Sequence, residues 1–199
     1  SLAKAGVLGF KAFMSHSGID EFPKVSEQNL RDVLFILAKH NLPLLVHAEL
    51  EDGDITTDDL ITYESYMATR PKSWENNAIK LLISLCAEFQ TPIHIVHLSS
   101  SEILNEISSA RENGLPITVE TCPHYLHFTA EIIADGDTRF KCAPPIRDAN
   151  NREQLWRGLK SGIIDFITSD HSPCQPELKK LSEGRFDKAW GGISSMQLT

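Results

Sequence analysis

The sequence lacks several features that mark particular classes of protein. It has only four cysteines, and no two of them form a CxxC pair, which favours buried thiols in a reducing compartment over a disulfide framework. No apolar run approaches the length of a membrane span, so we do not expect a membrane protein. Positive charge is in deficit, and the net charge of −8 argues against nucleic acid or an anionic membrane as a partner.

The ends of the chain also lack expected features. The first residues have no basic segment followed by an apolar one, so we expect no signal peptide, and a location in the cytoplasm or in another intracellular compartment. The chain begins without Met, and residues 194–199 add no closing helix or tail, so we expect a piece of a longer protein. No linker or repeat divides the 199 residues, and we therefore predict a single, partial domain over residues 1–199.

Apolar, strand-like segments alternate along the chain with segments of helical periodicity. The five predicted strands lie within residues 7–14, 44–47, 93–97, 117–122 and 163–170. The predicted helices begin near Ser26, Ser73, Ser100 or Ser101, and Asn150. The acidic stretch from Glu49 to Asp59 has the composition of a long, solvated loop. Such alternation predicts a parallel sheet covered by helices, an α/β fold.

Five strands leave two α/β architectures open. A five-stranded doubly wound sheet fits the length, because a complete eight-stranded barrel usually needs about 250 residues. A doubly wound sheet that binds phosphate predicts a glycine-rich loop after its first strand, but residues 14–18 contain a single glycine. Polar residues at the strand ends favour a TIM-type (β/α)8 barrel, because a ring gathers these ends around one point.

Three of the predicted strands end on side chains that can bind metals. His47 and His97 could each give an imidazole nitrogen to a divalent ion, and Asp170 could give a carboxylate oxygen. One histidine at a strand end is more often a hydrogen-bonded structural residue, but the ordered series favours a metal centre. His94 precedes His97 by three residues, so strand alternation predicts that it faces the opposite side, either packed on helices or behind the ligands.

The first predicted strand carries a lysine. Lys11 stands between Phe10 and Phe13, where burial would be costly unless the amine were paired or chemically altered. A neutral amine can react with CO₂, and the product is an anionic oxygen ligand that can bridge two metal ions. The alternative is a lysine whose amine reaches the edge of the strand.

Five short motifs stand out along the chain: residues 9–13 (GFKAF), 46–49 (VHAE), 94–100 (HIVHLSS), 120–125 (ETCPHY) and 169–174 (SDHSPC). Together they resemble the cyclic amidohydrolases, a family that includes allantoinase, dihydropyrimidinase (hydantoinase) and dihydroorotase. The resemblance runs over nearly the whole chain in the family's order. Residues 141–147 (KCAPPIR), 169–174 and 189–193 (AWGGI) most resemble the allantoinase branch of the family.

This resemblance implies a metal-dependent hydrolase with a TIM-type (β/α)8 barrel, of which only about strands 4–8 are present in this chain. It also implies a binuclear metal centre. Lys11 would be carboxylated and would bridge the ions, and His47 and His97 would bind one of them. Asp170 would bind the other and act as general base towards the bridging hydroxide, later returning the proton to the departing nitrogen. Two zinc ions are expected, although the same ligands also suit manganese, iron or cobalt. Two cations would lower the pKa of bound water and polarise the substrate carbonyl.

The same resemblance implies a small-molecule substrate, with allantoin hydrolysed at its ring amide to allantoate in purine catabolism. The backbone near Cys142 and Ala143, and near Gly191 and Gly192, would bind the imide or ureido groups, with Ser172 as a further candidate. The alternatives are a hydantoinase-type or dihydropyrimidinase-type enzyme, or a non-catalytic, dihydropyrimidinase-like interaction protein on the same barrel. The full-length protein is expected to be a homo-oligomer, a dimer or a tetramer.

The sequence departs from the family at the His-x-His pair that binds the more buried metal. No such pair occurs among the eight histidines, which are His16, His40, His47, His94, His97, His124, His127 and His171. The expected ligands present are therefore Lys11, His47, His97 and Asp170. His124 could lie behind the ligands or face the pocket, or could be a hydrogen-bonded structural histidine. We do not expect the isolated 199-residue chain to hydrolyse allantoin at a normal enzyme rate.

The lysine in the first strand gives a direct test of the bridging role. Lys11→Ala should abolish metal binding, because the carboxylated side chain would hold both ions together. Elemental analysis of a longer form of the protein measures this, with about two divalent ions per subunit expected before the substitution. Retained metal and retained activity in Lys11→Ala would contradict the bridging role.

Overall fold

The structure is a computed structural model that describes residues 2–53 and 60–198. Five parallel strands form one sheet, in which each strand pairs with the next one along the chain. The strands are β1 (Phe10–Phe13), β2 (Leu44–His47), β3 (Ile93–Ile95), β4 (Ile117–Thr121) and β5 (Phe166–Ile167). All five fall within the segments that the sequence predicts.

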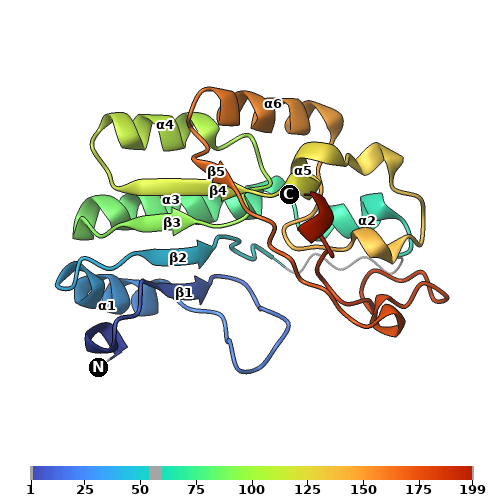
Figure 1. The fold of residues 1–199 in the computed structure, drawn as a ribbon, viewed down its shortest axis with the longest axis horizontal. Helices are drawn as coiled ribbons and strands as arrows, with labels where there is room; N and C mark the ends of the chain where they lie inside the picture. Colours follow the sequence, from blue (N-terminus) through green and yellow to red (C-terminus); the bar gives the residue numbers. More distant parts are fainter. Residues whose placement is uncertain (1, 54–59, 199) are drawn as a thin grey trace.

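The helices fall into two groups. The long helices α1 (Glu27–Ala38), α3 (Lys72–Phe89), α4 (Leu104–Glu112) and α6 (Ala149–Lys160) lie on one side of the sheet (Figure 1). The short helices α2 (Tyr63–Ala68) and α5 (Pro123–His127) lie with the C-terminal segment beyond the carboxyl ends of the strands (Figure 1). Short 3₁₀ helices are η1 (Leu2–Ala5), η2 (Ala130–Ile132), η3 (Thr138–Phe140), η4 (Pro176–Lys179) and η5 (Met196–Leu198).

The strand order separates the two predicted architectures. A doubly wound sheet carries helices on both faces and reverses its strand order at one point. Here the order is β1-β2-β3-β4-β5, and the long helices keep to one side of the sheet (Figure 1). This is the arrangement of consecutive β/α units in a barrel, which is the fold that the sequence favours.

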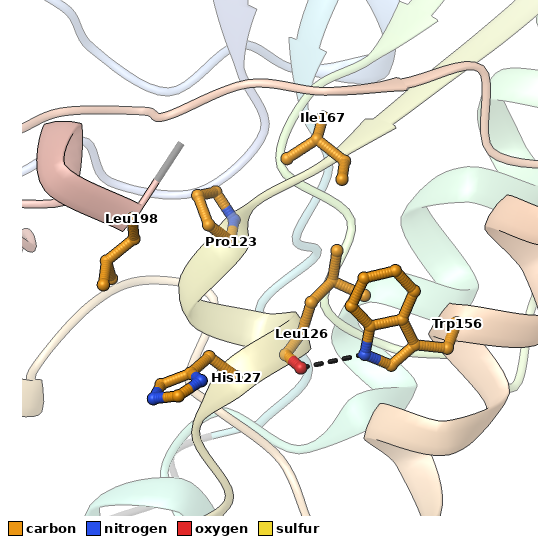
Figure 2. A pocket seen from close by; sticks show the side chains of 6 residues that line it. All are labelled: Pro123, Leu126, His127, Trp156, Ile167 and Leu198. Carbon is orange, nitrogen blue, oxygen red and sulfur yellow. Dashed lines mark hydrogen bonds between the residues drawn. The ribbon is translucent and has the colours of Figure 1, made fainter.

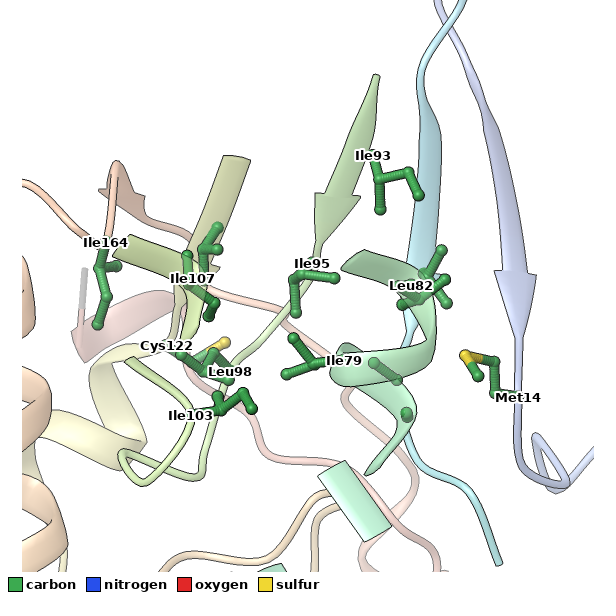
Figure 3. Close-up of a cluster of buried hydrophobic side chains, with 14 of the residues drawn as sticks. Met14, Ile79, Leu82, Ile93, Ile95, Leu98, Ile103, Ile107, Cys122 and Ile164 are labelled. Carbon is green, nitrogen blue, oxygen red and sulfur yellow. The ribbon is translucent and has the colours of Figure 1, made fainter. Parts of the chain in front are cut away.

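The core lies between the sheet and the long helices. Alternate strand residues such as Val46, Ile95 and Val119 are buried there. They belong to one cluster with Ile79 and Leu82 of α3, neither of which is accessible to solvent, and Figure 3 shows part of this cluster. The apolar stripe of α3 therefore anchors the middle of the sheet.

The opposite face of the sheet, called here the open face, carries a different set of side chains. The register pairs Lys11 with Leu45, Leu45 with His94, and His94 with Thr118, so these four residues form one row across β1 to β4. Lys11 and Thr118 are exposed. The expectation that Lys11 is buried in its strand is therefore wrong for this chain, because the lysine points away from the helix layer.

His94 also belongs to the open face. Its Nδ1 lies 2.7 Å from Thr118 Oγ1, and its Nε2 lies 3.1 Å from Glu120 Oε2. The alternative that His94 packs against the helices is therefore wrong. The alternation argument fails because β3 ends at Ile95 and the backbone of His97 turns into the left-handed region, with φ at 42°.

The helix starts predicted from the sequence agree with the structure for α1 and differ from it for α4 and α6. Ser26 caps α1 as predicted, since its side chain accepts a hydrogen bond from the backbone of Asn29. The cap of α6 is Asp148 rather than Asn150. The cap position of α4 is Ile103, after the serines that the sequence suggests. None of the described helices combines the length and the apolar character that crossing a membrane requires.

Two residues of α1 provide a matched test of the core. Leu34 is inaccessible and faces the sheet, whereas Ile36 is 53% exposed on the same helix. Leu34→Ala should lower the free energy of unfolding by about 2–5 kcal/mol, because it removes buried methyl groups and leaves a cavity. Urea unfolding measures this, and Ile36→Ala should cost much less. Equal losses in the two variants would contradict the assignment of the buried face.

Candidate metal centre

The ends of β2 and β3 bring two histidines into contact. His47 is the last residue of β2, and His97 lies two residues beyond the end of β3. The Nδ1 atom of His47 lies 3.0 Å from the Nε2 atom of His97, and both side chains are buried. The left-handed backbone of His97 turns this ring towards β2. The sequence therefore places both residues correctly at one edge of the sheet.

A buried carboxylate contacts the far side of the His47 ring. Glu49 Oε2 lies 2.7 Å from His47 Nε2, and Arg70 binds both oxygens of Glu49, at 2.5 Å through Nη2 and at 3.1 Å through Nε. Burial alone would raise the pKa of Glu49, but Arg70 and His47 together hold it below its usual range. An ionised carboxylate can only accept hydrogen bonds, so His47 donates from Nε2, and as a metal ligand it would present a lone pair on Nδ1.

The inaccessible Glu49 corrects one expectation from the sequence. The stretch from Glu49 to Asp59 is predicted to be a solvated loop, yet the Glu49 side chain has no exposure to solvent. The prediction is wrong at this residue because Arg70, 21 positions further along the chain, neutralises its charge. Residues 54–59 of the same stretch lie outside the described residues.

A second buried ion pair supports the segment that follows His97. Glu75 accepts hydrogen bonds from the backbone of Ser99 at 2.9 Å and Ser100 at 3.1 Å, and it pairs with Arg147 at 2.9 Å. Arg147 also donates to the backbone carbonyl of Arg70 at 2.6 Å. The Ser100 amide therefore donates to a carboxylate, and α4 begins later, with Ile103 at its cap position. The two ion pairs together tie the segment after His97 to the arginine that holds Glu49.

The facing histidine nitrogens fit a divalent metal ion. Two nitrogens that bind one zinc at about 2.0–2.1 Å would lie roughly 3.3 Å apart, close to the spacing of His47 and His97. Burial, with the nearby His47 and Lys11, holds the pKa of His97 well below its usual range, so its imidazole is neutral as a metal ligand must be. Its Nδ1 has no hydrogen-bond partner among the described residues.

The other two predicted ligands, Lys11 and Asp170, lie in different places relative to the two histidines. Lys11 lies on the open face with its Nζ 5.0 Å from the centre of the Phe13 ring, which in turn lies 5.6 Å from the His47 ring. Asp170 is exposed after β5, and no hydrogen bond or ion pair joins it to His47 or His97 in the part of the chain that the structure describes. Within residues 2–53 and 60–198, no three His, Cys, Asp or Glu side chains form a metal-binding group.

The predicted substrate-binding segments meet near the C-terminus. The backbone amide of Gly192 donates to the carbonyl of Lys141 at 2.8 Å, and the amide of Ser172 donates to the carbonyl of Ile193 at 3.0 Å. Gly191 is exposed beside this contact. Three segments far apart in the sequence therefore form one surface, with Ser172 directly against Gly192.

Cys142 and Ala143 continue this surface towards α2. Cys142 is buried, and its carbonyl accepts a hydrogen bond from the Tyr66 hydroxyl at 2.7 Å. Burial also raises the pKa of its thiol to about 12, which leaves the sulfur a neutral group. Ala143 is half-buried beside it. Tyr66 belongs to α2, and Arg70 follows the end of this helix by two residues.

Comparison with known proteins decides the family. No family model matches the chain. Over 209 residues, 99% of this chain, it is 52% identical to the allantoinase of Arabidopsis thaliana, of which it covers 41%. It is 48% identical over 211 residues to a probable allantoinase of Oryza sativa subsp. japonica, covering 99% of this chain and 42% of that one. The chain belongs to the cyclic amidohydrolases.

A solved structure confirms the fold of this cyclic amidohydrolase chain. It matches the L-hydantoinase (dihydropyrimidinase) from Arthrobacter aurescens with a TM-score of 0.88 and 27% identity, over 99% of this chain and 46% of that one. The family resemblance and the partial α/β barrel predicted from the sequence are both confirmed. The chain spans less than half the length of the curated relatives named above.

The polar residues that support the histidines are the ones that sequence reasoning missed. Glu49 stands in the family-like stretch VHAE, two residues after His47, and this spacing is a signal that could have drawn attention to it. Arg70 and Glu75 carry no comparable pattern. Their roles depend on contacts between residues separated by more than 20 positions along the chain.

The pocket that the structure shows does not include His47 or His97 in its lining. It has a volume of about 310 Å³ and is mostly apolar, and Figure 2 shows its lining. The lining residues are Pro123, Leu126, His127, Trp156, Ile167 and Leu198. None of the predicted ligands or substrate-binding residues is among them, so we assign the site from the histidines and not from this pocket.

His124 lies outside the hydrogen-bonded network. Its side chain is 1% exposed in α5, and neither ring nitrogen has a hydrogen-bond partner among the described residues. Burial lowers its pKa to about 4, so the ring is neutral near pH 7. The alternative that His124 is a hydrogen-bonded structural histidine is therefore wrong.

Two adjacent glycines test the contact between the predicted substrate-binding segments. A Cβ on Gly192 would lie 2.5 Å from Ser172 Oγ and 2.8 Å from its carbonyl oxygen, and the glycine has φ at 147°. Gly192→Ala should therefore destabilise the protein by about 1–3 kcal/mol through overpacking and backbone strain. Denaturant unfolding and limited proteolysis between residues 172 and 192 would measure the effect.

Gly191→Ala is the matched control for this substitution. The nearest atom to a Cβ on Gly191 is Lys141 Cε at 3.9 Å, an ordinary contact. This variant should keep the stability and protease resistance of the unchanged protein. A Gly192→Ala protein as stable as Gly191→Ala would show that the two segments do not pack as described.

Proposed function

We propose that the protein containing this chain hydrolyses a cyclic amide at a divalent metal centre, and that its substrate is allantoin, opened to allantoate. The observation that carries this proposal is the facing pair of nitrogens on His47 and His97, 3.0 Å apart at the carboxyl ends of two parallel strands. Identity of 52% to an allantoinase supports the choice of substrate.

Four side chains are proposed as metal ligands. His47 and His97 would bind through Nδ1 and Nε2, the two atoms that face each other. Lys11, on the open face of β1, would join them as a carbamate, formed when its neutral Nζ bonds to the carbon of CO₂ and releases a proton. Asp170 would complete the set from the end of β5. We propose zinc as the metal, because zinc binds the imidazole nitrogens and carboxylate oxygens that these side chains offer.

The chain's own groups would handle the proton. Bound divalent ions would supply an activated hydroxide and polarise the amide carbonyl. Asp170, which is exposed after β5, would accept the proton of the attacking water on its carboxylate. It would then return this proton to the ring nitrogen as the C–N bond breaks, so one residue would serve as base and then as acid.

The substrate-binding residues are proposed from the groups that remain available. The amide of Gly192 already donates to Lys141, and the carbonyl of Cys142 already accepts from Tyr66. The second lone pair of the Cys142 carbonyl, the backbone of Ala143 and Gly191, and the Ser172 hydroxyl would then bind imide or ureido groups. This arrangement offers both donors and acceptors, which a cyclic diamide requires.

A hydantoinase-type enzyme is the second candidate. The match to the L-hydantoinase of Arthrobacter aurescens, with a TM-score of 0.88, favours it, because that fold would hold the same ligands. The two candidates differ in the ring that they accept and not in the metal site. Substrate choice therefore separates them.

The test uses the complete protein that contains residues 1–199, loaded with Zn²⁺. Initial rates with allantoin, hydantoin, dihydrouracil and dihydroorotate should be highest for allantoin. Asp170→Asn should lower kcat by about 10²–10⁴-fold, because the proton acceptor is lost. Asp32→Asn, at an exposed carboxylate on α1, should leave kcat unchanged.

Each contrary result identifies a different error. Faster hydrolysis of hydantoin or dihydrouracil would replace the allantoinase proposal with the hydantoinase-type one. A protein that binds no divalent metal and hydrolyses none of the four compounds would support a non-catalytic interaction protein. Full activity in Asp170→Asn would remove the proposed general base.

A further inference from the structure

We propose that Glu49, held in place by Arg70, is a positioning residue that directs the Nδ1 lone pair of His47 to the metal. This inference rests on the proposed metal centre, and it deepens it by assigning a role to two residues outside the ligand set. Glu49 contacts the ring of His47 on the side away from His97, so it acts through the histidine.

The first step of the argument is the geometry of the His47 ring. Its two nitrogens have different partners: Nε2 lies 2.7 Å from Glu49 Oε2, and Nδ1 lies 3.0 Å from His97 Nε2. A carboxylate offers no proton, so the hydrogen bond fixes the proton on Nε2. A hydrogen-bonded carboxylate of this kind orients a metal-binding imidazole and increases its basicity.

The second step is that Glu49 itself cannot turn. Arg70 binds it with Nε on one oxygen and Nη2 on the other, which is the bidentate arrangement that fixes both groups in one plane. The backbone of Arg70 is held in turn by Arg147, whose guanidinium pairs with Glu75. The orientation of His47 therefore depends on a continuous series of buried and half-buried polar contacts.

The third step is that this series returns to the second histidine. Glu75 binds the backbone amides of Ser99 and Ser100, which follow His97 directly after Leu98. The side chain of His47 and the backbone beside His97 are thus held by one connected set of residues. Relative movement of the two metal-facing nitrogens would therefore strain this set of hydrogen bonds.

Stability alone does not explain this arrangement. Desolvation of two charges offsets most of their attraction, so a buried ion pair adds little stability compared with well-packed apolar side chains. Glu49 is inaccessible at the carboxyl edge of the sheet, its partner Arg70 is 19% exposed, and one oxygen of the carboxylate is used on a histidine. Precise placement of that histidine is a benefit that an apolar replacement would not give.

The experiment measures zinc affinity separately from activity and from folding. Glu49→Gln in the complete protein keeps the size of the side chain but loses its charge. We expect the dissociation constant for Zn²⁺, measured by competition with a coloured chelator, to rise about 10–100-fold. The visible spectrum of the Co²⁺-loaded variant should also change, because one imidazole ligand is no longer held in a single orientation.

The control variant removes another acid–arginine pair at the opposite end of the strands. Asp165 precedes β5, where it binds Arg111 and accepts from the Val119 amide at 2.7 Å. Asp165→Asn should lower the stability of the metal-free protein and leave both the zinc affinity and the cobalt spectrum unchanged. Urea unfolding of the metal-free forms puts the two variants on one stability scale.

A third variant covers the case in which Glu49→Gln fails to fold. Arg70→Lys keeps the positive charge but loses the two parallel hydrogen bonds to Glu49. It should raise the zinc dissociation constant in the same direction by a smaller factor. Unchanged zinc affinity in Arg70→Lys would then overturn the inference.

The outcomes separate this inference from the proposed function. An unchanged zinc affinity in a folded Glu49→Gln protein, with zinc bound by the unchanged protein, overturns the positioning role alone. Equal loss of zinc affinity in Glu49→Gln and Asp165→Asn, in proportion to lost stability, also overturns it. An unchanged protein that binds neither Zn²⁺ nor Co²⁺ overturns the proposed function, and this inference with it.

Discussion

The constraint on which the rest of the structure depends is the parallel pairing of five consecutive strands. Parallel pairing sends every strand in the same direction, so the carboxyl ends of β1 to β5 meet at one edge. The long helices cover one side of this sheet and bury the alternate apolar residues of each strand. The other residues of the same strands are thereby committed to the open face. Lys11, Leu45 and His94 share a row there because the register allows no other placement.

The polar residues at this edge of the sheet are limited by the free-energy cost of burying charge. Charged groups cannot be buried unless each has a partner. Glu49 and Glu75 are both buried, and each accepts hydrogen bonds from an arginine and from a further donor. The pKa of Glu49 stays below its usual range, whereas burial raises the pKa of Glu75 in spite of Arg147. The difference arises because Glu49 also accepts a hydrogen bond from His47, whereas Glu75 lies near the negative charge of Glu49.

Much of the fold and part of the site could be predicted from the sequence. The strand segments and the helix capped by Ser26 are local features, since periodicity and capping depend on residues within a few positions of one another. His47 and His97 could be found for the same reason, because each closes or follows an apolar strand. His94 could not be placed correctly, because its orientation depends on where β3 ends and on the left-handed turn at His97.

The sequence by itself determined the β/α order, the family resemblance and the identity of the candidate ligands, because each of these depends on short contiguous stretches of residues. Only the tertiary structure decided that Lys11 is exposed on the open face and that Gly192 rests on Ser172. It also decided that Glu49 is buried against Arg70 and orients His47. These features depend on which distant residues meet once the strands align, and hydrogen bonds between positions 21 to 76 residues apart leave no pattern in a single sequence.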